Sequence, residues 1–532
     1  MRDWWRGGVL YQIYPWSFAD SNGDGIGDLP GITARLDYVA GLGVEGIWLS
    51  PFFTSPMKDF GYDVADYRDV DPRFGTLADF DRLLERAHGL GLKVVIDQVY
   101  SHTSDLHPWF VESRESRDNP RADWYVWAEA KPDGMPPNNW LAVFGGVAWQ
   151  WEPRRRQYYL HNFLKEQPDL NLHNPEVQDA ILDVARFWLD RGVDGFRLDV
   201  ANFYMHDLEL RDNPPRPNPT PVKEYHLQRP IYNRTRPETL GFIARLRGVL
   251  DEYPGTMTVA EIASETPVRT MADYTDGPDR LHTAYSFLLL SPAFSAGHIR
   301  RSVEEMEAAS AGGAWPSWAF SNHDVVRVAT RWGGATPSPA LIMLLLALLP
   351  ALRGTAFLYQ GEELGLPQSE VPRERLRDPE GITFWPRHKG RDGCRTPMPW
   401  LADAPFAGFS TVEPWLPVEP AHRPLAVDRQ DTESRSPLAF TRRFLRWRRE
   451  HPALVEGDIR FLDAPEPILA FERQGGGERL VCVFNLGDRP ASFDLPFAAQ
   501  PVGPDGPGLS GVVDGRTVRL PPWGGVFAKD IG

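Results

Sequence analysis

The chain has 532 residues and a mass of 60.1 kDa, and 42% of its residues are hydrophobic. This composition suits a large globular domain with a smaller second one, and it excludes a disordered chain. The 57 basic and 72 acidic residues give a formal charge of −15. That charge argues against nucleic acid or an anionic membrane as a partner, because phosphate binding needs clustered lysine and arginine.

Short apolar runs alternate with stretches of helical periodicity along most of the chain. The helical pattern is clearest at residues 77–90 and 177–190, where apolar side chains recur every three to four positions. Eight strand–helix units in series predict an α/β fold, the (β/α)8 or TIM barrel, whose catalytic residues lie at the C-terminal ends of the strands. The predicted strands are 9–14, 46–50, 94–100, 195–200, 258–262, 283–287, 317–321 and 356–360.

Two long segments interrupt this alternation. Residues 102–171 are rich in proline, tryptophan and asparagine and are too long for a loop, so they predict an inserted subdomain after the third strand. Residues 207–237 have little periodicity and predict a long loop beside the active site.

The pattern changes again after a predicted last barrel helix near 438–449. Short alternating runs at 459–462, 468–472, 479–485 and 513–520 predict a small antiparallel β-domain. The barrel is therefore expected at 1–101 and 172–455, the inserted subdomain at 102–171 and a C-terminal, β-sandwich-like domain at 456–532.

Cysteine content and apolar segments bear on the compartment. Cys394 and Cys482 are too few for a disulfide framework or a zinc site, which predicts reduced thiols in a cytoplasmic protein. The N-terminus shows no signal-peptide pattern. The longest apolar run, 341–352, is too short to span a bilayer and predicts a buried helix, so no membrane partner is expected.

Three carboxylates, Asp199, Glu261 and Asp324, close or follow predicted strands. Such groups are costly at the end of a buried strand unless a site needs them, so they predict acid–base chemistry on a sugar or similar polyol. Arg197 would point the same way as Asp199 and keep it ionised, although this spacing alone fits a structural ion pair equally well. Burial of Glu261 should raise its pKa, as a general acid requires; a helix cap or a surface position is the alternative.

Residues 20–28 read Asp-Ser-Asn-Gly-Asp-Gly-Ile-Gly-Asp. Oxygen-bearing side chains that alternate with glycines are how a short loop wraps a hard cation. A turn without metal is the alternative. The segment lies far from the three carboxylates in sequence, which indicates a structural site.

With these segments the sequence resembles glycoside hydrolase family 13, the α-amylase family, in its α-glucosidase and oligo-1,6-glucosidase branch. The resemblance covers nearly the whole chain and rests on ordered motifs at 8–15, 61–67, 97–102, 167–171, 195–199, 259–261, 320–324, 360–363 and 395–398. It implies that Asp199 is the nucleophile, Glu261 the general acid and base, and Asp324 the group that grips sugar hydroxyls in the −1 subsite, where the cleaved glucose lies.

The resemblance also implies the remaining ligand groups. The −1 subsite would be completed by Tyr62, Asp63, His102, Phe163, Arg197, His323 and Arg391. Asp63 and Arg391 would close the pocket beyond the non-reducing end, which produces exo action. One structural Ca²⁺ or Mg²⁺ would be held by Asp20, Asn22, Asp24, the Ile26 carbonyl and Asp28, and no organic cofactor is expected.

Departures from the α-amylase pattern bear on the expected calcium site and on the expected substrate. Ser101 replaces the asparagine that serves a calcium site between barrel and subdomain, and the Lys-His pair that follows the nucleophile in amylases is missing. The first departure argues against an amylase-type calcium at that place, and the second weakens the case for cleavage of long polymers. Val200 follows the nucleophile, as it tends to do in α-1,6-cleaving members.

The sequence therefore predicts a retaining, exo-acting α-glucosidase, monomeric or homodimeric, that releases α-glucose from short substrates such as maltose or isomaltose. The alternative is a transglucosidase or a sucrose or trehalose isomerase with the same first step, and loop 207–237 would decide between them. A non-catalytic transporter subunit is disfavoured, because the carboxylates are present and a membrane helix is not expected.

Overall fold

The fold is described from a computed structural model for residues 3–219, 221–310, 313–502 and 509–531. Eight parallel strands form a closed barrel in the order β1-β13-β12-β11-β10-β9-β5-β2. They are β1 (Val9–Ile13), β2 (Gly46–Leu49), β5 (Lys93–Gln98), β9 (Gly195–Leu198), β10 (Met257–Ile262), β11 (Thr283–Ser286), β12 (Trp315–Ala319) and β13 (Thr355–Tyr359). The predicted barrel is confirmed, and each predicted strand overlaps one of these.

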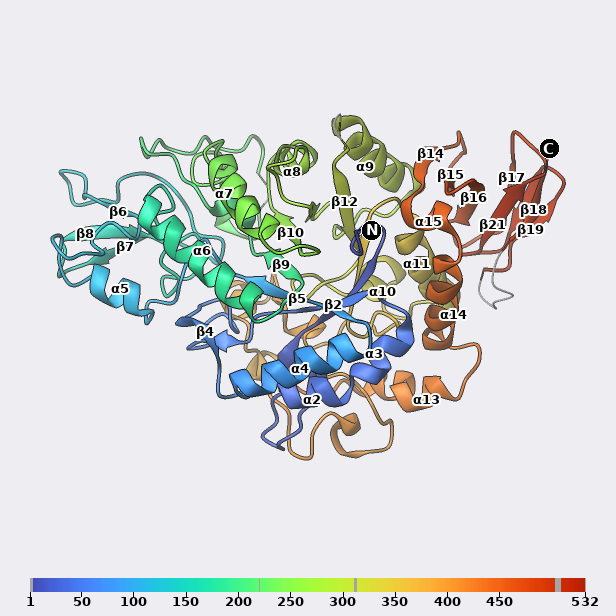
Figure 1. The fold of residues 1–532 in the computed structure, drawn as a ribbon, viewed down its shortest axis with the longest axis horizontal. Coiled ribbons are helices and arrows are strands. Elements are labelled where there is room, and N and C mark those ends of the chain that lie inside the picture. Colours follow the sequence, from blue (N-terminus) through green and yellow to red (C-terminus); the bar gives the residue numbers. More distant parts are fainter. Residues whose placement is uncertain (1–2, 220, 311–312, 503–508, 532) are drawn as a thin grey trace.

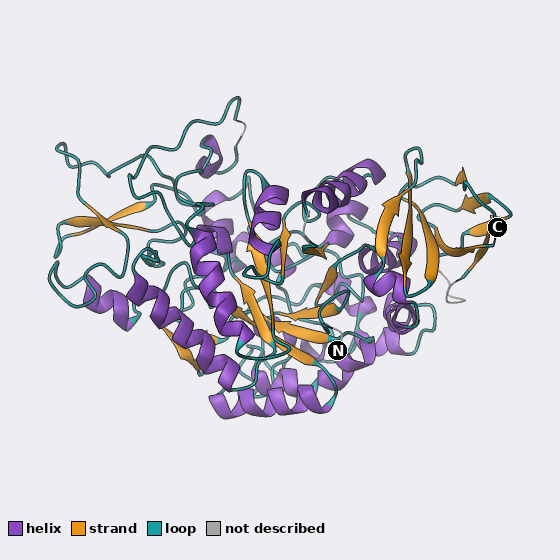
Figure 2. Cartoon of the chain, turned by 45° about the horizontal axis from the view of Figure 1, so that its top comes forward, coloured by secondary structure: helices purple, strands orange, loops and turns teal. Residues whose placement is uncertain are grey.

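The barrel strands are buried on both faces, as their near-continuous apolar sequences predict. Side chains such as Leu10, Trp48, Val95, Val259 and Phe357 form one buried cluster contributed by strands around the barrel. The barrel is therefore a packed core rather than a pore. Helices surround the central strands in Figure 2.

Local signals explain where the longer helices begin. Thr76 and Asp79 form a reciprocal capping box at the start of α4, and Asn174 caps α6, with Pro175 in its first turn. The predicted apolar segment 341–352 is the buried helix α11. The helices around the barrel include α2 (Leu29–Ala34), α3 (Leu36–Leu42), α4 (Leu77–Gly89), α6 (Pro175–Asp190), α7 (Thr239–Asp251), α8 (Pro267–Thr275), α9 (Ala296–Ala309), α10 (Val328–Gly333), α11 (Pro339–Ala351) and α14 (Pro437–Arg449).

The inserted segment and the long connections carry their own short elements. Between β5 and α6 lie α5 (Pro108–Ser113) and a sheet of β6 (Trp127–Ala128), β8 (Gln157–Leu160) and β7 (Trp149–Glu152), at the left of Figure 1. The remaining short elements are α1 (Pro15–Phe18), β3 (Phe53–Thr54), β4 (Asp66–Val70), α12 (Pro379–Phe384), α13 (Val427–Asp431) and α15 (Pro452–Glu456).

The C-terminal region is antiparallel, as predicted, and lies at the right of Figure 1. One sheet contains β14 (Asp458–Phe461), β15 (Ile468–Gly475), β16 (Glu478–Asn485), β21 (Gly525–Asp530) and β18 (Ala499–Pro501); the other contains β17 (Ala491–Asp494), β20 (Thr517–Leu520) and β19 (Val512–Asp514).

The predicted single run 513–520 is in fact a hairpin of β19 and β20. Gly515 provides the positive φ, +62°, that the tight turn between these strands requires. The residues Asp514-Gly515-Arg516-Thr517 interrupt the polar–apolar alternation, and Asp-Gly is a typical hairpin-turn pair, so the sequence did carry a signal for the turn.

Two further observations concern the cysteines and the apolar helices. Cys394 and Cys482 are both buried and unpaired. Among the described residues, no helix combines the length and apolar character that a membrane crossing requires.

Candidate active site

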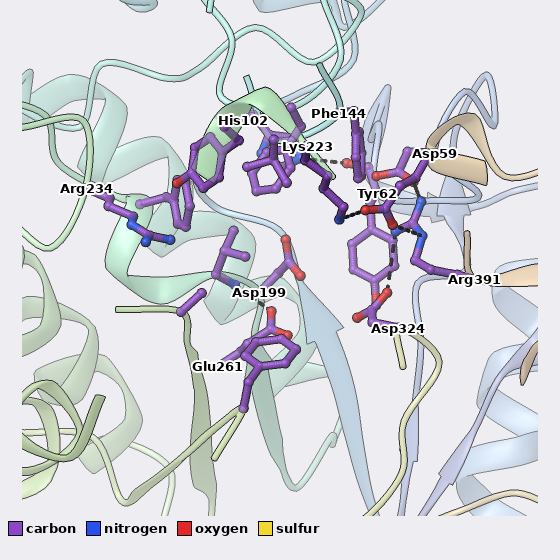
Figure 3. Close-up of a pocket in the computed structure, with 18 of the residues that line it drawn as sticks. Asp59, Tyr62, His102, Phe144, Asp199, Lys223, Arg234, Glu261, Asp324 and Arg391 are labelled. Carbon is purple, nitrogen blue, oxygen red and sulfur yellow. Dashed lines mark hydrogen bonds and ion pairs between the residues drawn. The ribbon is translucent and has the colours of Figure 1, made fainter. Parts of the chain in front are cut away.

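The three predicted carboxylates lie at the C-terminal ends of barrel strands and line one cavity of about 320 Å³ (Figure 3). Asp199 directly follows β9, Glu261 is in β10, and Asp324 follows β12. The register pairs Leu198 with Ala260, which places Glu261 beside Asp199. Parallel strands thus bring together carboxylates that are far apart in sequence.

Arg197 contacts both Asp199 and Glu261 from outside the cavity. Its side chain is fully buried, and its Nη atoms lie 2.6 Å from Asp199 Oδ1 and 2.6 Å from Glu261 Oε2. It also donates to Asp97 at 2.9 Å. Arg197 therefore positions the two carboxylates and does not itself line the cavity. A single guanidinium in contact with both groups favours the short separation of retaining glycosidases, roughly 5–5.5 Å.

The charged groups and the burial around Asp199 and Glu261 suit acid–base catalysis. Burial raises the pKa of both Asp199 and Glu261 to about 7, against the lowering effect of Arg197. The charge of Asp199 also raises the pKa of Glu261, and the charges of Asp97 and Asp324 raise that of Asp199. Near neutral pH the pair holds one proton, which is the state that catalysis by one nucleophile and one acid requires.

These pKa values predict a bell-shaped dependence of kcat/KM on pH with its maximum near 7. Activity falls on the acid side because Asp199 becomes protonated, and on the alkaline side because Glu261 loses its proton. Glu261→Gln, assayed with a substrate whose leaving group needs little protonation, should lose the alkaline limb and keep the acid limb. An alkaline limb that persists in this variant would contradict the assignment of Glu261.

Asp324 is held in a different state. Burial raises its pKa, but His323 and the guanidinium groups of Arg391 and Arg395, 3.4 and 3.0 Å away, outweigh this and lower it below its usual value. Asp324 is therefore a fixed anion on the cavity wall, suited to accept hydrogen bonds from sugar hydroxyls.

The predicted aromatic and histidine residues divide into two groups. Tyr62, His102 and Phe163 line the cavity, and burial lowers the pKa of His102 to about 4, so this ring is neutral. His323 is fully buried behind Tyr62, with the rings stacked 5.4 Å apart and Tyr62 Oη 2.5 Å from Nε2. His323 thus supports Tyr62 and does not face the cavity.

The structure differs from expectation at Asp63. Its side chain is buried outside the cavity and accepts hydrogen bonds from Ser55 Oγ (2.9 Å) and from the backbone amides of Lys58 (2.8 Å) and Asp59 (3.0 Å). Of the two aspartates in this turn, Asp59 is the one that pairs with Arg391, at 2.7 Å, beside the Arg391–Asp378 pair at 2.6 Å. Asp59 and Arg391 both line the cavity. Asp59 and Asp63 lie four residues apart in one turn, so the sequence did not show which of them faces the cavity. The backbone conformation of the turn decides it.

Loop 207–237 forms part of the cavity wall, as predicted, but its contributing residues were not identified from the sequence. They are Lys223, Tyr225, His226 and Arg234. Lys223 contacts Glu380 of α12 and so ties this loop to the segment that carries Arg391. A loop rich in proline, asparagine and arginine after the strand that carries Asp199 was the available signal.

Val200 has an unusual backbone. Its φ of +35° and ψ of +50° are left-handed, which costs a β-branched residue about 1–3 kcal/mol. Its amide donates to Glu261 Oε2 at 3.2 Å, and its side chain lines the cavity. The strained turn therefore links the end of β9, next to Asp199, to Glu261 of β10.

The predicted metal loop 20–28 is closed by its own hydrogen bonds. Asp20 accepts from the amides of Gly23 and Gly25, Asp24 from that of Ile26, and Asp28 caps α2. The ligand types fit a hard cation, but within the described residues no three histidine, cysteine or acidic side chains gather as a metal site.

Comparison with known proteins decides the family. The family model described as "Alpha amylase, catalytic domain" matches residues 12–457. The chain belongs to the α-amylase family. A second model, a domain of unknown function, matches residues 461–527 and so covers the C-terminal sheets.

Full-length relatives agree with this assignment. A probable α-glucosidase of Rhizobium meliloti is 54% identical over 99% of this chain and 97% of its own length, and an oligo-1,6-glucosidase of Heyndrickxia coagulans is 39% identical over 93% and 94%. The crystal structure of an α-glucosyl transfer enzyme, XgtA, superposes with a TM-score of 0.97 at 58% identity, covering 100% of both chains. Trehalulose synthase from Pseudomonas mesoacidophila gives 0.89 at 32% identity, covering 99% of this chain and 100% of its own. The protein is a glycoside hydrolase with its three carboxylates in place.

Proposed function

We propose that the protein is a retaining, exo-acting α-glucosidase that removes single glucose units from short α-glucosides. The observation that carries this proposal is the Asp199–Glu261 pair, joined by Arg197, inside a cavity that the Asp59–Arg391 ion pair borders. An ion pair at one end of the pocket leaves room for the terminal sugar of a chain but not for a chain that continues in both directions.

Each residue has a defined part in this reaction. Asp199 attacks the anomeric carbon while Glu261 protonates the departing oxygen, which yields a covalent β-glucosyl-enzyme. Glu261 then removes a proton from water, which attacks the same carbon and breaks the bond to Asp199. The two inversions release α-glucose. The fixed anion Asp324 binds sugar hydroxyls throughout.

The proposal predicts the order and kind of products. Maltose, isomaltose and longer oligomers should lose one glucose at a time, and the first glucose seen by NMR should be the α-anomer. Val200 on the cavity wall supports a preference for isomaltose over maltose, measured as the ratio of kcat/KM. A rapid fall in starch viscosity, which marks internal cuts, or initial release of β-glucose would contradict the proposal.

Transfer of glucose to another acceptor is the second candidate function. It is favoured by the similarity to a solved enzyme described as an α-glucosyl transfer enzyme and to a trehalulose synthase. The first step would be the same, and a sugar hydroxyl would then replace water. A product time course from maltose, isomaltose, sucrose and trehalose separates the two: free glucose marks hydrolysis, and new di- or trisaccharides mark transfer or isomerisation.

We further propose that loop 20–28 binds one structural Ca²⁺ or Mg²⁺, supported by its oxygen-rich pattern and by the bond from Ser410 to Asp20, which ties the loop to a distant segment. The two buried, unpaired cysteines support a cytoplasmic location, where a monomer or homodimer would act on small oligosaccharides.

Metal removal should lower the melting temperature more than it lowers initial activity at low temperature, because the loop lies outside the cavity. Asp24→Ala is the sharpest variant, since this carboxylate accepts hydrogen bonds from Asn22 and from the Ile26 amide, both within the loop. It should bind no metal by calorimetry and should melt at the same temperature with and without chelator. A wild-type protein whose melting ignores both chelator and added Ca²⁺ would refute the site.

A further inference from the structure

Arg234 lies on the wall of the cavity that loop 207–237 forms. In Figure 3 it lies on the opposite side from Arg391, with Asp199 and Glu261 between them. Its side chain is only 9% exposed. The guanidinium lies over the rings of Phe203 and Tyr225, at 5.2 and 5.5 Å, and these contacts fix its plane.

The outer nitrogens of this guanidinium make one long ion-pair contact and no hydrogen bond among the described residues. Its Nε donates to the Pro230 carbonyl at 3.3 Å. Glu265, the nearest acid, is 3.7 Å from Nη2 and already accepts a 2.6 Å hydrogen bond from Arg216. Within the described part of the chain, neither Nη atom of Arg234 has a hydrogen-bond partner. These donors lie on a side chain that forms part of the cavity wall, so they remain available to a ligand that enters the cavity.

The position of Arg234 identifies which part of a ligand it meets. The Asp59–Arg391 pair borders the cavity on the far side of the carboxylates, where the cleaved glucose would end. Arg234 lies on the opposite side, where the group beyond the cleaved bond must lie. A planar fork of donors suits two neighbouring oxygen acceptors, such as adjacent hydroxyls of a second sugar.

We propose that Arg234 is the specificity-determining residue for that second sugar, binding adjacent hydroxyls of the leaving group. This inference rests on the proposed glucosidase function. The same subsite then receives an acceptor in the reverse sense: its hydroxyl attacks the glucosyl carbon, the bond to Asp199 breaks, and Glu261 takes the hydroxyl proton.

The test compares substrates with and without a second sugar. α-Glucosyl fluoride has a leaving group too small to reach Arg234, whereas isomaltose and maltose present one. Arg234→Met should lower kcat/KM for the disaccharides by roughly 10- to 100-fold more than for the fluoride. It should also lower the fraction of glucosyl-enzyme captured by added glucose as disaccharide. Arg234→Lys, which keeps the charge but loses the fork, should fall between.

Arg216→Met is the matched control, because Arg216 shares Glu265 but does not line the cavity. It should leave the ratio of disaccharide to fluoride kcat/KM unchanged. An equal loss on both substrates in Arg234→Met and Arg234→Lys, or an equal shift in Arg216→Met, would overturn the inference. Failure of the wild-type protein to turn over α-glucosyl fluoride would instead overturn the proposed function itself.

Discussion

Asp199→Ala should leave a folded protein whose kcat/KM on maltose or isomaltose is lower by about 10⁴-fold or more, because no covalent intermediate can form. Glu261→Gln should lose roughly 10²- to 10⁴-fold on the same substrates, because the leaving oxygen departs unprotonated. Both carboxylates touch Arg197 in the structure, so each variant removes one member of a joined pair. Thermal melting should show that both variants remain folded.

Azide distinguishes the two roles. In Asp199→Ala, azide can occupy the space of the lost carboxylate and attack α-glucosyl fluoride directly, which inverts the carbon and yields β-glucosyl azide. In Glu261→Gln the covalent intermediate still forms, and azide, which needs no base, releases α-glucosyl azide. Identical azide products from the two variants would sink the assignment, as would near-wild-type turnover of maltose by either.

The barrel could be predicted from sequence because its strands are buried on both faces. A run such as Val94–Ile96 is apolar at every position, and the polar residue that ends it marks the strand's C-terminal end. The same logic located Asp199 and Glu261. It failed at 513–520, where the Asp514-Gly515 turn signal in the middle of the run was not recognised.

The other residues that line the cavity could not be predicted from the sequence in this way. Lys223 and Arg234 lie in a segment with no periodicity, and distant contacts fix their positions: Lys223 meets Glu380 of α12, and Arg234 packs on Phe203. Sequence patterns report local geometry, whereas these positions depend on how separate loops meet above the barrel.

Asp59 and Asp63 show the same limit within one turn, and they give the second large expected effect. Asp59→Asn should lower kcat/KM for disaccharides by roughly 10²-fold, because Arg391 loses a charged partner that lines the cavity. Its melting temperature should change little, since Arg391 keeps its hydrogen bonds to Asp378.

Asp63→Asn should lower the stability of the protein and leave its activity nearly unchanged. The three hydrogen bonds that its carboxylate accepts include two backbone amides, and an asparagine can offer only one acceptor oxygen to them. About 1–3 kcal/mol of stability should be lost, while kcat/KM of the folded protein at low temperature stays within a few-fold of wild type. Calorimetric melting and initial rates on isomaltose measure both quantities in both variants. The two substitutions are matched, because they remove the same charge four residues apart and differ only in which side of the turn they change. If Asp63→Asn lost activity without losing stability and Asp59→Asn kept its activity, Asp63 rather than Asp59 would be the residue that closes the pocket.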